Sequence, residues 1–397
     1  MRDAPITPAD QRPFGYFVHH QGRGHAERCA AIVNALPPCR PVTIFCARDD
    51  IFPPLPPHAR IHLIPSLFER AGGEGDMDHL PTPDTLHCAP LGWPGIRRAM
   101  GQIAAWFARA DPALMICDVS AEIAQLARIC SVPHVKVLQH GDRGDPGHQA
   151  AYMGAVGLLA PFAAALAQPD WQPFADRIHF APGLGIDTAP LPDRAAARRA
   201  LGLEPDRALA LVVSGAGGTG FSQAPLGVAA RTRPDWHWLT IGRLQEEWHA
   251  TAGRNLTFKG WVGDAATHIA AADLVISSTG NTTCAQVLAA GKPWIVVPEW
   301  RYFDEQRLKA IALDRAGAAL HLPHLPSSAQ AWEAAITRAQ ARHDPAAQAR
   351  LLSPDPAPAT AAWLEGLVRD LWAPRMQPEA RPAQPLTEQS STKGIPA

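Results

Sequence analysis

Short apolar runs alternate with longer stretches of helical periodicity along most of this chain. In the first half, runs such as FGYFV (14–18), VTIFC (42–46) and ALMIC (113–117) have the length of buried strands. Helical spacing of apolar residues follows them at 26–36, 95–109 and 121–130. Because strands joined by helices pair in parallel, the pattern predicts a parallel sheet with helices on both faces. Further strands of this sheet are expected at 61–64, 134–138, 157–160 and 178–180.

The alternation stops at 181–193 (APGLGIDTAPLPD), a Gly- and Pro-rich stretch typical of a linker, and then starts again. With 397 residues the chain is long enough for two domains. We therefore expect an α/β fold of two doubly wound, Rossmann-like domains facing a cleft. The expected strands of the second half are 209–214, 236–241, 256–258, 273–276 and 294–297, with helices at 283–290 and 304–316. The expected boundaries are 1–185 and 194–350 for the domains, 351–375 for a C-terminal helix and 376–397 for a polar, disordered tail.

Charge, hydropathy and cysteine content indicate which partners and which cell compartment to expect. The formal net charge is −1, so the overall charge predicts no nucleic-acid partner. No apolar run reaches the roughly 18 residues of a membrane span, and residues 1–13 lack the pattern of a secretory signal. Seven scattered cysteines without a C-x-x-C pair indicate reduced thiols. These features favour a cytoplasmic protein.

The first glycine-rich turn, HHQGRGH (19–25), lies directly between an expected strand and an expected helix. Glycines let a backbone approach a ligand closely, and a helix N-terminus favours negative charge. His25 stands at the helix start, where the helix dipole favours the neutral imidazole that a general base requires. The alternative is a structural turn with capping residues.

Two further turns open helices in the second half. GAGGTG (215–220) matches the dinucleotide fingerprint G-x-G-x-x-G, but the next strand ends in Gly242 and Arg243 and has no acidic residue for a ribose. An arginine there leaves an NADP enzyme as an alternative. SSTGNTT (277–283) brings hydroxyls, a glycine and a helix N-terminus to one point, which suits a diphosphate. Ordinary helix capping would explain the same hydroxyls.

Residues 272–317 resemble the donor-site signature of GT-B glycosyltransferases. The similarity is to the branch that contains the peptidoglycan N-acetylglucosaminyltransferase and the bacterial UDP-glycosyltransferases. It rests on a strand, a Gly-containing turn, a helix, A-A-G-x-P, a strand ending in proline, and an acid–Gln pair. Weaker similarity extends to 258–264, 214–220 and the G-R-G-H turn. The resemblance implies the GT-B fold, with an acceptor-binding first domain and a nucleotide-sugar-binding second domain.

The same resemblance implies roles for individual residues of the second half. The diphosphate would be bound by Gly217, Gly218, Gly280, Asn281 and Thr282. Val262 would line the base, and Glu305 with Gln306 would bond hydroxyls of the donor sugar. Gln286 stands where the family carries a Glu that accepts both ribose hydroxyls, and loss of that charge costs about 1 kcal/mol. The identity of the base, uridine or another, is therefore open.

In the first half, the resemblance implies that His25 is the base and that Asp118 orients it. A cap for the helix that follows is the alternative for Asp118. The acceptor side would be formed by Gly22, Gly24, His140, Asp142 and Arg143. A plain polar loop is the alternative for the last three, and His140 is also a rival base.

The implied activity is an inverting, metal-independent glycosyltransferase that uses a UDP-sugar and an unidentified acceptor, lipid-linked in some relatives. No cofactor and no metal are expected. The one Asp-x-Asp, at 76–78, is expected to be a solvated loop. The implied process is cell-envelope or polysaccharide biosynthesis. Alternatives are a UDP-sugar 2-epimerase of the same fold and a nucleotide-sugar-binding protein without catalysis.

Two apolar features bear on a peripheral contact with the inner face of a membrane. The helix expected at 95–109 has apolar residues on one side, and its spacing favours a place in the core over a membrane-facing one. Trp261 and Trp300 flank the donor motifs, where they would either stack on a ligand or pack in the interior.

Overall fold

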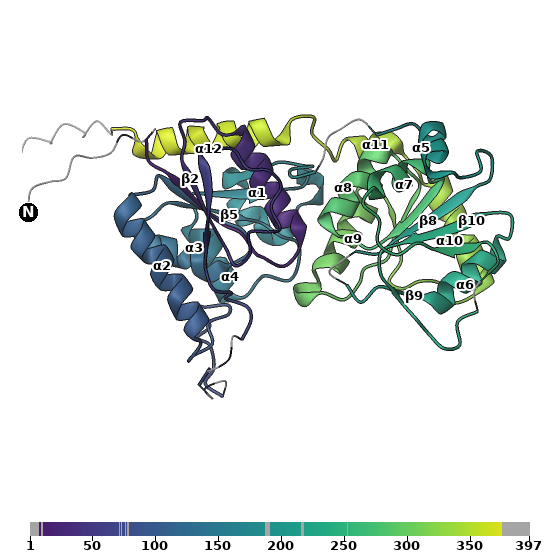
Figure 1. Cartoon of the computed structure of the whole chain (residues 1–397), viewed down its shortest axis with the longest axis horizontal. Helices are drawn as coiled ribbons and strands as arrows, with labels where there is room; N and C mark the ends of the chain where they lie inside the picture. The colour runs from purple at the N-terminus through teal and green to yellow at the C-terminus, as the bar shows by residue number, and fades with distance from the viewer. Residues whose placement is uncertain are drawn as a thin grey trace, which may run out of the picture.

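The structure is a computed structural model that describes residue 8 and residues 11–70, 72, 74, 75, 77, 79–186, 191–215, 218–251 and 253–374. Within these residues the chain forms two α/β halves that lie side by side (Figure 1). Five predicted features lie outside the described residues: Gly217, Asp76, Asp78, positions 187–190 of the expected linker, and the tail at 376–397.

The first half is built on a seven-stranded sheet with the order β3-β2-β1-β4-β5-β6-β7, in which every described pair is parallel. Its strands are β1 (Phe14–Phe17), β2 (Val42–Cys46), β3 (Ala59–Leu63), β4 (Leu114–Cys117), β5 (His134–Val137), β6 (Gly157–Ala160) and β7 (Ile178–Phe180). Its helices are α1 (Arg23–Ala35), α2 (Pro94–Ala110), α3 (Ala121–Ile129) and α4 (Pro146–Gly154), with 3₁₀ turns η1 (Ala164–Leu166) and η2 (Pro169–Arg177). The central strands are buried on both faces, as their unbroken apolar runs predict.

The second half has a six-stranded parallel sheet with the order β12-β10-β8-β13-β14-β15 and a small pair, β11-β9. Its strands are β8 (Leu209–Val213), β9 (Phe221–Ser222), β10 (His237–Ile241), β11 (Leu244–Gln245), β12 (Leu256–Phe258), β13 (Leu274–Ser277), β14 (Trp294–Val296) and β15 (Leu320–His321). Its helices are α5 (Arg194–Leu201), α6 (Gln223–Thr232), α7 (Ala265–Ala271), α8 (Asn281–Ala290), α9 (Glu305–Arg315), α10 (Ala329–Ala341), α11 (Pro345–Ala349) and α12 (Pro356–Trp372), with η3 (Tyr302–Asp304). The predicted class, two doubly wound Rossmann-like units, is confirmed.

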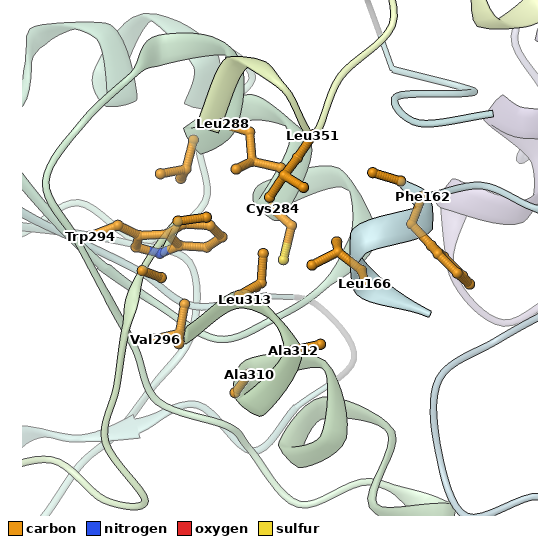
Figure 2. Packing of buried hydrophobic residues seen from close by; sticks show 14 of the residues in the cluster. Phe162, Leu166, Cys284, Leu288, Trp294, Val296, Ala310, Ala312, Leu313 and Leu351 are labelled. Carbon is orange, nitrogen blue, oxygen red and sulfur yellow. The ribbon is translucent and has the colours of Figure 1, made fainter. Parts of the chain in front are cut away.

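The two halves share a core. One cluster of buried apolar residues contains side chains of both, and Leu166 of η1 lies beside Cys284 and Leu313 of the second half (Figure 2). The helix α12 then returns across the first half, next to α1 (Figure 1). There Leu364 is fully buried and Glu365 pairs with Arg40, with 2.7 Å between Oε2 and Nη2. Apolar burial is the main stabilising force in such an arrangement, so the halves hold one another in place.

The helix predicted at 95–109 is α2, and it belongs to the core. Its residues Ile103, Trp106 and Phe107 are buried, whereas Arg97 and Arg98 are exposed. The core interpretation is therefore confirmed over the membrane-facing one. Among the described residues, no helix combines the length and the apolar character that crossing a membrane requires.

Candidate functional site

The first glycine-rich turn places His25 at the carboxyl edge of the first sheet. Gly22 has φ +91°, a conformation that favours glycine, and it precedes the first residue of α1. β1 and β4 are adjacent, so the residue after β4, Asp118, lies next to the turn that follows β1. His25 Nδ1 is 3.1 Å from Asp118 Oδ1. The structure therefore brings the two predicted residues, His25 and Asp118, into contact.

Asp118 is fully buried and pairs with a residue that the sequence did not single out, Arg28. The guanidinium bonds both carboxylate oxygens, with Nη2 2.8 Å from Oδ2 and 3.0 Å from Oδ1. Burial alone would raise the pKa of Asp118, but the charges of Arg28 and His25 hold it well below its usual range. The helix-cap interpretation of Asp118 is wrong, because Ser120 caps α3 by accepting a bond from Ile123 N.

His25 Nδ1 also lies 2.9 Å from Arg28 Nη2. A guanidinium only donates and a carboxylate only accepts, so Nδ1 satisfies one of them at a time. With Asp118 as the partner, Nδ1 carries the proton and Nε2 is the basic nitrogen. The His25 side chain is 18% exposed, which leaves this ring open toward solvent.

The start of α8 faces the start of α1. Gly280 precedes α8 and is surrounded by open space, since an added Cβ would have no neighbour within 4 Å among the described residues. A Cβ added at Gly24 would lie 3.5 Å from the Thr282 hydroxyl. Thr282 also bonds the carboxylate of Glu27, whose pKa is raised by burial and held down by Arg23 and by this bond. Two helix N-termini, one from each half, thus meet at the predicted diphosphate position.

A buried cation lies at the same place. Lys309 is 4% exposed, and its Nζ donates to Thr279 O at 3.3 Å and to the side chain of Asn281. It lies 4.0 Å from Glu305, one turn earlier on α9. The sequence analysis missed Lys309, although its spacing of four from Glu305 places both on one helix face.

The two residues of the acid–Gln pair, Glu305 and Gln306, have different surroundings. Gln306 is only 5% exposed, and its Oε1 accepts from Glu299 N at 2.8 Å and Thr279 N at 3.4 Å. This oxygen ties two loops together, so the predicted bond from Gln306 to the donor sugar would have to come from its Nε2 amino group, and that role stays a prediction. Glu305 is 25% exposed in its side chain and stays a candidate for the sugar hydroxyls.

The other predicted donor residues lie along the same edge of the second sheet. Gly218 abuts Glu299, whose carboxylate would lie 2.1 to 2.5 Å from a Cβ at that position, so a side chain there would displace this carboxylate. Glu299 Oε1 also accepts from Gly220 N at 2.8 Å. Val262 and Gln286 are half-buried, in the loop before α7 and in α8.

The loop after β5, predicted to face the acceptor, docks on the second half. A Cβ at Gly141 would lie 2.8 Å from Phe303 O, and Asp142 N donates to the same oxygen at 2.6 Å. Arg143 Nη2 lies 3.8 Å from Glu305 Oε2, and its guanidinium stacks over the Phe303 ring at 4.7 Å. Asp142 is exposed, but Arg143 is buried and bridges to a donor-side residue.

His140 does not face a cleft. It is 1% exposed, and its Nε2 lies 2.8 Å from Leu166 O, with the ring packed against Phe162 and Trp171, which stack on each other. Neither an acceptor contact nor a rival base fits this position, and both predictions are wrong. Burial, with a contribution from Lys309, lowers the pKa of His140 to about 3.

We expect His140 to make stability fall in mild acid. The unfolded histidine binds a proton below about pH 6.5, whereas the buried one stays neutral to about pH 3, so stability is lost as the pH falls below 6.5. At pH 5 this amounts to about 2 kcal/mol. In His140→Gln, which keeps a donor for Leu166, the difference in unfolding free energy between pH 7 and pH 5 should shrink by that amount in urea titrations. His324→Gln, at an exposed position, is the control, and an equal change in both variants would contradict the assignment.

His87, Asp145 and His148 form a candidate cation group, with ligand atoms within 4.8 Å of one another. Two imidazoles and a carboxylate suit a divalent ion such as zinc. However, His148 Nδ1 lies 2.5 Å from Asp145, and its Nε2 lies 3.1 Å from Arg143 Nη1. Both nitrogens already have partners, so a cation would have to displace one of them. Metal independence stays a prediction.

The fold is similar to those of several glycosyltransferases with solved structures. The structure of the glycotransferase of kitacinnamycin is similar over 90% of this chain and 99% of that one, with a TM-score of 0.61 and 16% identity. CalG4, the calicheamicin glycosyltransferase, is similar over 92% of this chain and 100% of its own, with a TM-score of 0.60 and 17% identity. MurG of Acinetobacter baumannii is similar over 91% of this chain and 99% of its own, with a TM-score of 0.53 and 14% identity. At these identities the similarity establishes the fold.

The family comparison covers the donor motifs. Residues 243–350 match the model described as the glycosyltransferase family 28 C-terminal domain. The chain has the GT-B fold. The stretch that is similar to the family 28 model contains Gly280, Thr282 and Glu305 of the candidate donor site.

A curated relative matches over a shorter stretch. It is the UDP-N-acetylglucosamine–N-acetylmuramyl-(pentapeptide) pyrophosphoryl-undecaprenol N-acetylglucosamine transferase of Solidesulfovibrio magneticus, 40% identical over 74 residues. The match covers 18% of this chain and about one fifth of that relative's length.

Proposed function

We propose that this chain is an inverting glycosyltransferase that moves a sugar from a nucleoside diphosphate, UDP first, to an acceptor hydroxyl. The observation that carries the proposal is the meeting of two groups at one point. His25, paired with Asp118, stands in the first turn of α1 beside Gly24, where an added Cβ would lie 3.5 Å from the hydroxyl of Thr282 in the first turn of α8. A general base and an anion-binding helix N-terminus are the two elements that such a transfer requires.

In this proposal His25 Nε2 accepts the proton of the acceptor hydroxyl as its oxygen bonds to the anomeric carbon. The bond from that carbon to the diphosphate oxygen breaks, and the electron pair leaves with the diphosphate. The anomeric carbon gains positive charge and the leaving group gains negative charge. The N-terminus of α8 and the ammonium of Lys309 would stabilise the leaving group without a metal ion.

We further propose a lipid-linked acceptor as the first to test. The name of the Solidesulfovibrio relative gives a pyrophosphoryl-undecaprenol acceptor. A cytoplasmic chain that contacts the inner face of the membrane peripherally would meet such a substrate. Trp261 and Trp300, beside the donor motifs, are 64% and 74% exposed, so they are available to a ligand and the interior-packing interpretation is wrong.

A thermal-shift panel of UDP, dTDP, GDP and NADP tests the donor site. Saturation at about 100 times Kd stabilises the native state by about 2.7 kcal/mol, which should raise Tm by several degrees for one nucleoside diphosphate. Gly280→Asp, which adds a carboxylate before α8, should abolish the shift. Gly101→Asp adds the same charge on the exposed face of α2 and should leave it intact.

Other outcomes of the panel contradict the proposal. Stabilisation by NADP alone would favour the dinucleotide interpretation of residues 215–220. No shift with any of the four would indicate a degenerate site. If a UDP-sugar binds and is converted to its 2-epimer without release of UDP, the chain is an epimerase.

A further inference from the structure

A cavity of about 450 Å³ opens at the outer edge of the first half, away from the second half. It lies between the edge strand β3 and the helix α2, which is the helix farthest from the second half in Figure 1. Its lining residues come from these two elements and are Arg60, Ile61, His62, Trp106, Arg109 and Ala110. None of them belongs to the candidate donor or acceptor side.

The sheet register explains why polar groups gather there. Arg60 is opposite Thr43 and His62 is opposite Phe45, so both lie on the face that α2 covers. The Trp106 ring stands edge-on to Phe45 at 5.2 Å. Since no strand follows β3 at this edge in the described sheet, the space beyond Trp106 remains open.

All the polar groups that line this cavity are hydrogen-bond donors or can become so. The lining holds two guanidiniums, an imidazole and an indole N–H, and it contains no Asp or Glu among the described residues. Arg60 Nε lies 3.3 Å from the Thr43 hydroxyl, which is neutral. Arg109 has no carboxylate within ion-pair distance among the residues that the structure describes. The electrostatic potential at this point therefore favours an anion.

The indole supplies a second observation. Trp106 is 3% exposed, and its Nε1 has no hydrogen-bond partner. Its Cζ3 and Cη2 atoms lie against Gly15, so the pyrrole end of the ring, which carries Nε1, points away from the centre of the sheet. A buried donor without an acceptor is costly and uncommon in folded proteins. Nε1 is itself shielded from solvent, so an anion in the cavity would supply the missing acceptor only once the ring moves to expose it.

We propose that this cavity binds the phosphate group of an organic phosphate. Arg60 and Arg109 pair with the phosphate oxygens, because a planar guanidinium matches their geometry. Ala110 and the Trp106 ring contact the apolar part of the same ligand. The phosphate belongs either to a soluble compound or to the headgroup of a membrane lipid. The proposal is independent of the glycosyltransferase activity, because the cavity shares no residue with that site.

Calorimetric titration with pyrophosphate tests the site. Arg60→Gln/Arg109→Gln should weaken its binding by at least tenfold or remove one binding event, and Trp106→Phe should weaken it several-fold. Arg97→Gln/Arg98→Gln removes the same charge from exposed positions of the same helix and should change affinity less than twofold. Binding in the donor cleft would persist in every variant, so the difference between the two double variants reports the cavity alone.

Vesicles separate the two sources of phosphate. Co-sedimentation with phosphatidylglycerol vesicles but not phosphatidylcholine vesicles, lost in Arg60→Gln/Arg109→Gln, identifies a lipid headgroup. Pyrophosphate binding without sedimentation identifies a soluble phosphate compound. The proposal is wrong if both double variants lose binding equally. It is also wrong if Arg60→Gln/Arg109→Gln binds pyrophosphate and vesicles just as the unaltered chain does, or if neither of them binds either one.

Discussion

Replacing His25 with alanine should slow release of the nucleoside diphosphate from its sugar by 10²- to 10⁴-fold, the usual contribution of a general base. The donor dissociation constant should change less than about threefold. The reason is positional: Nδ1 is held by Asp118 within the first half, so removal of the ring deletes the basic Nε2 but no candidate donor contact of the second half. The measurement is the rate of UDP release from the donor that the thermal-shift panel identifies, together with its affinity by calorimetry.

His19→Ala is the matched control for that experiment. His19 belongs to the same turn, and its ring centroid lies 5.6 Å from that of His25. Its ring stacks on Phe68, and burial lowers its pKa to about 3, which makes it a poor base at neutral pH. The rate should fall less than tenfold. If His25→Ala keeps more than a third of the activity, the base lies elsewhere, and if it also loses donor binding, His25 has a structural role.

The fold could be predicted well because its signal is local. Runs such as Val42–Cys46 and Leu209–Val213 are apolar throughout, which is typical of strands buried on both faces of a parallel sheet. The two-residue strands β9, β11 and β15 were missed because they have no run to detect. α1 begins at Arg23, three residues before the expected start, because Gly22 can take the positive φ that starts the helix there.

The site could be predicted where topology alone brings residues together. His25 and Asp118 follow strands that pair in the sheet, so their meeting needed no knowledge of side-chain packing. Arg28 and Lys309 were missed, because each reaches the site from one helical turn beyond a predicted residue. His140 was misassigned for a different reason. Its side chain turns inward to the Leu166 carbonyl, as the Gln306 oxygen turns to two backbone N–H groups, and a sequence does not show burial.

The second large effect concerns the buried ion pair. Arg28→Met should lower the free energy of unfolding by about 3–5 kcal/mol, because it leaves the fully buried Asp118 carboxylate without a counter-charge. Asp118→Asn should cost a similar amount, since Arg28 is only 3% exposed. The double variant should lose much less than the sum, with a coupling of at least about 2 kcal/mol in urea unfolding at pH 7. If the loss in the double variant equals the sum of the two single losses within about 0.5 kcal/mol, the interaction between Arg28 and Asp118 does not contribute to stability.

The same double variant separates stability from catalysis. Asp50→Asn provides a control, because the Arg48–Asp50 pair is 51% and 62% exposed, and an exposed ion pair contributes little to stability. Arg28→Met/Asp118→Asn should stay folded with a smaller loss than the sum of the two single losses, yet release the nucleoside diphosphate at least tenfold more slowly, because His25 Nδ1 has lost the carboxylate that fixes its proton. A double variant that is both stable and fully active would show that Asp118 holds the fold and does not position His25.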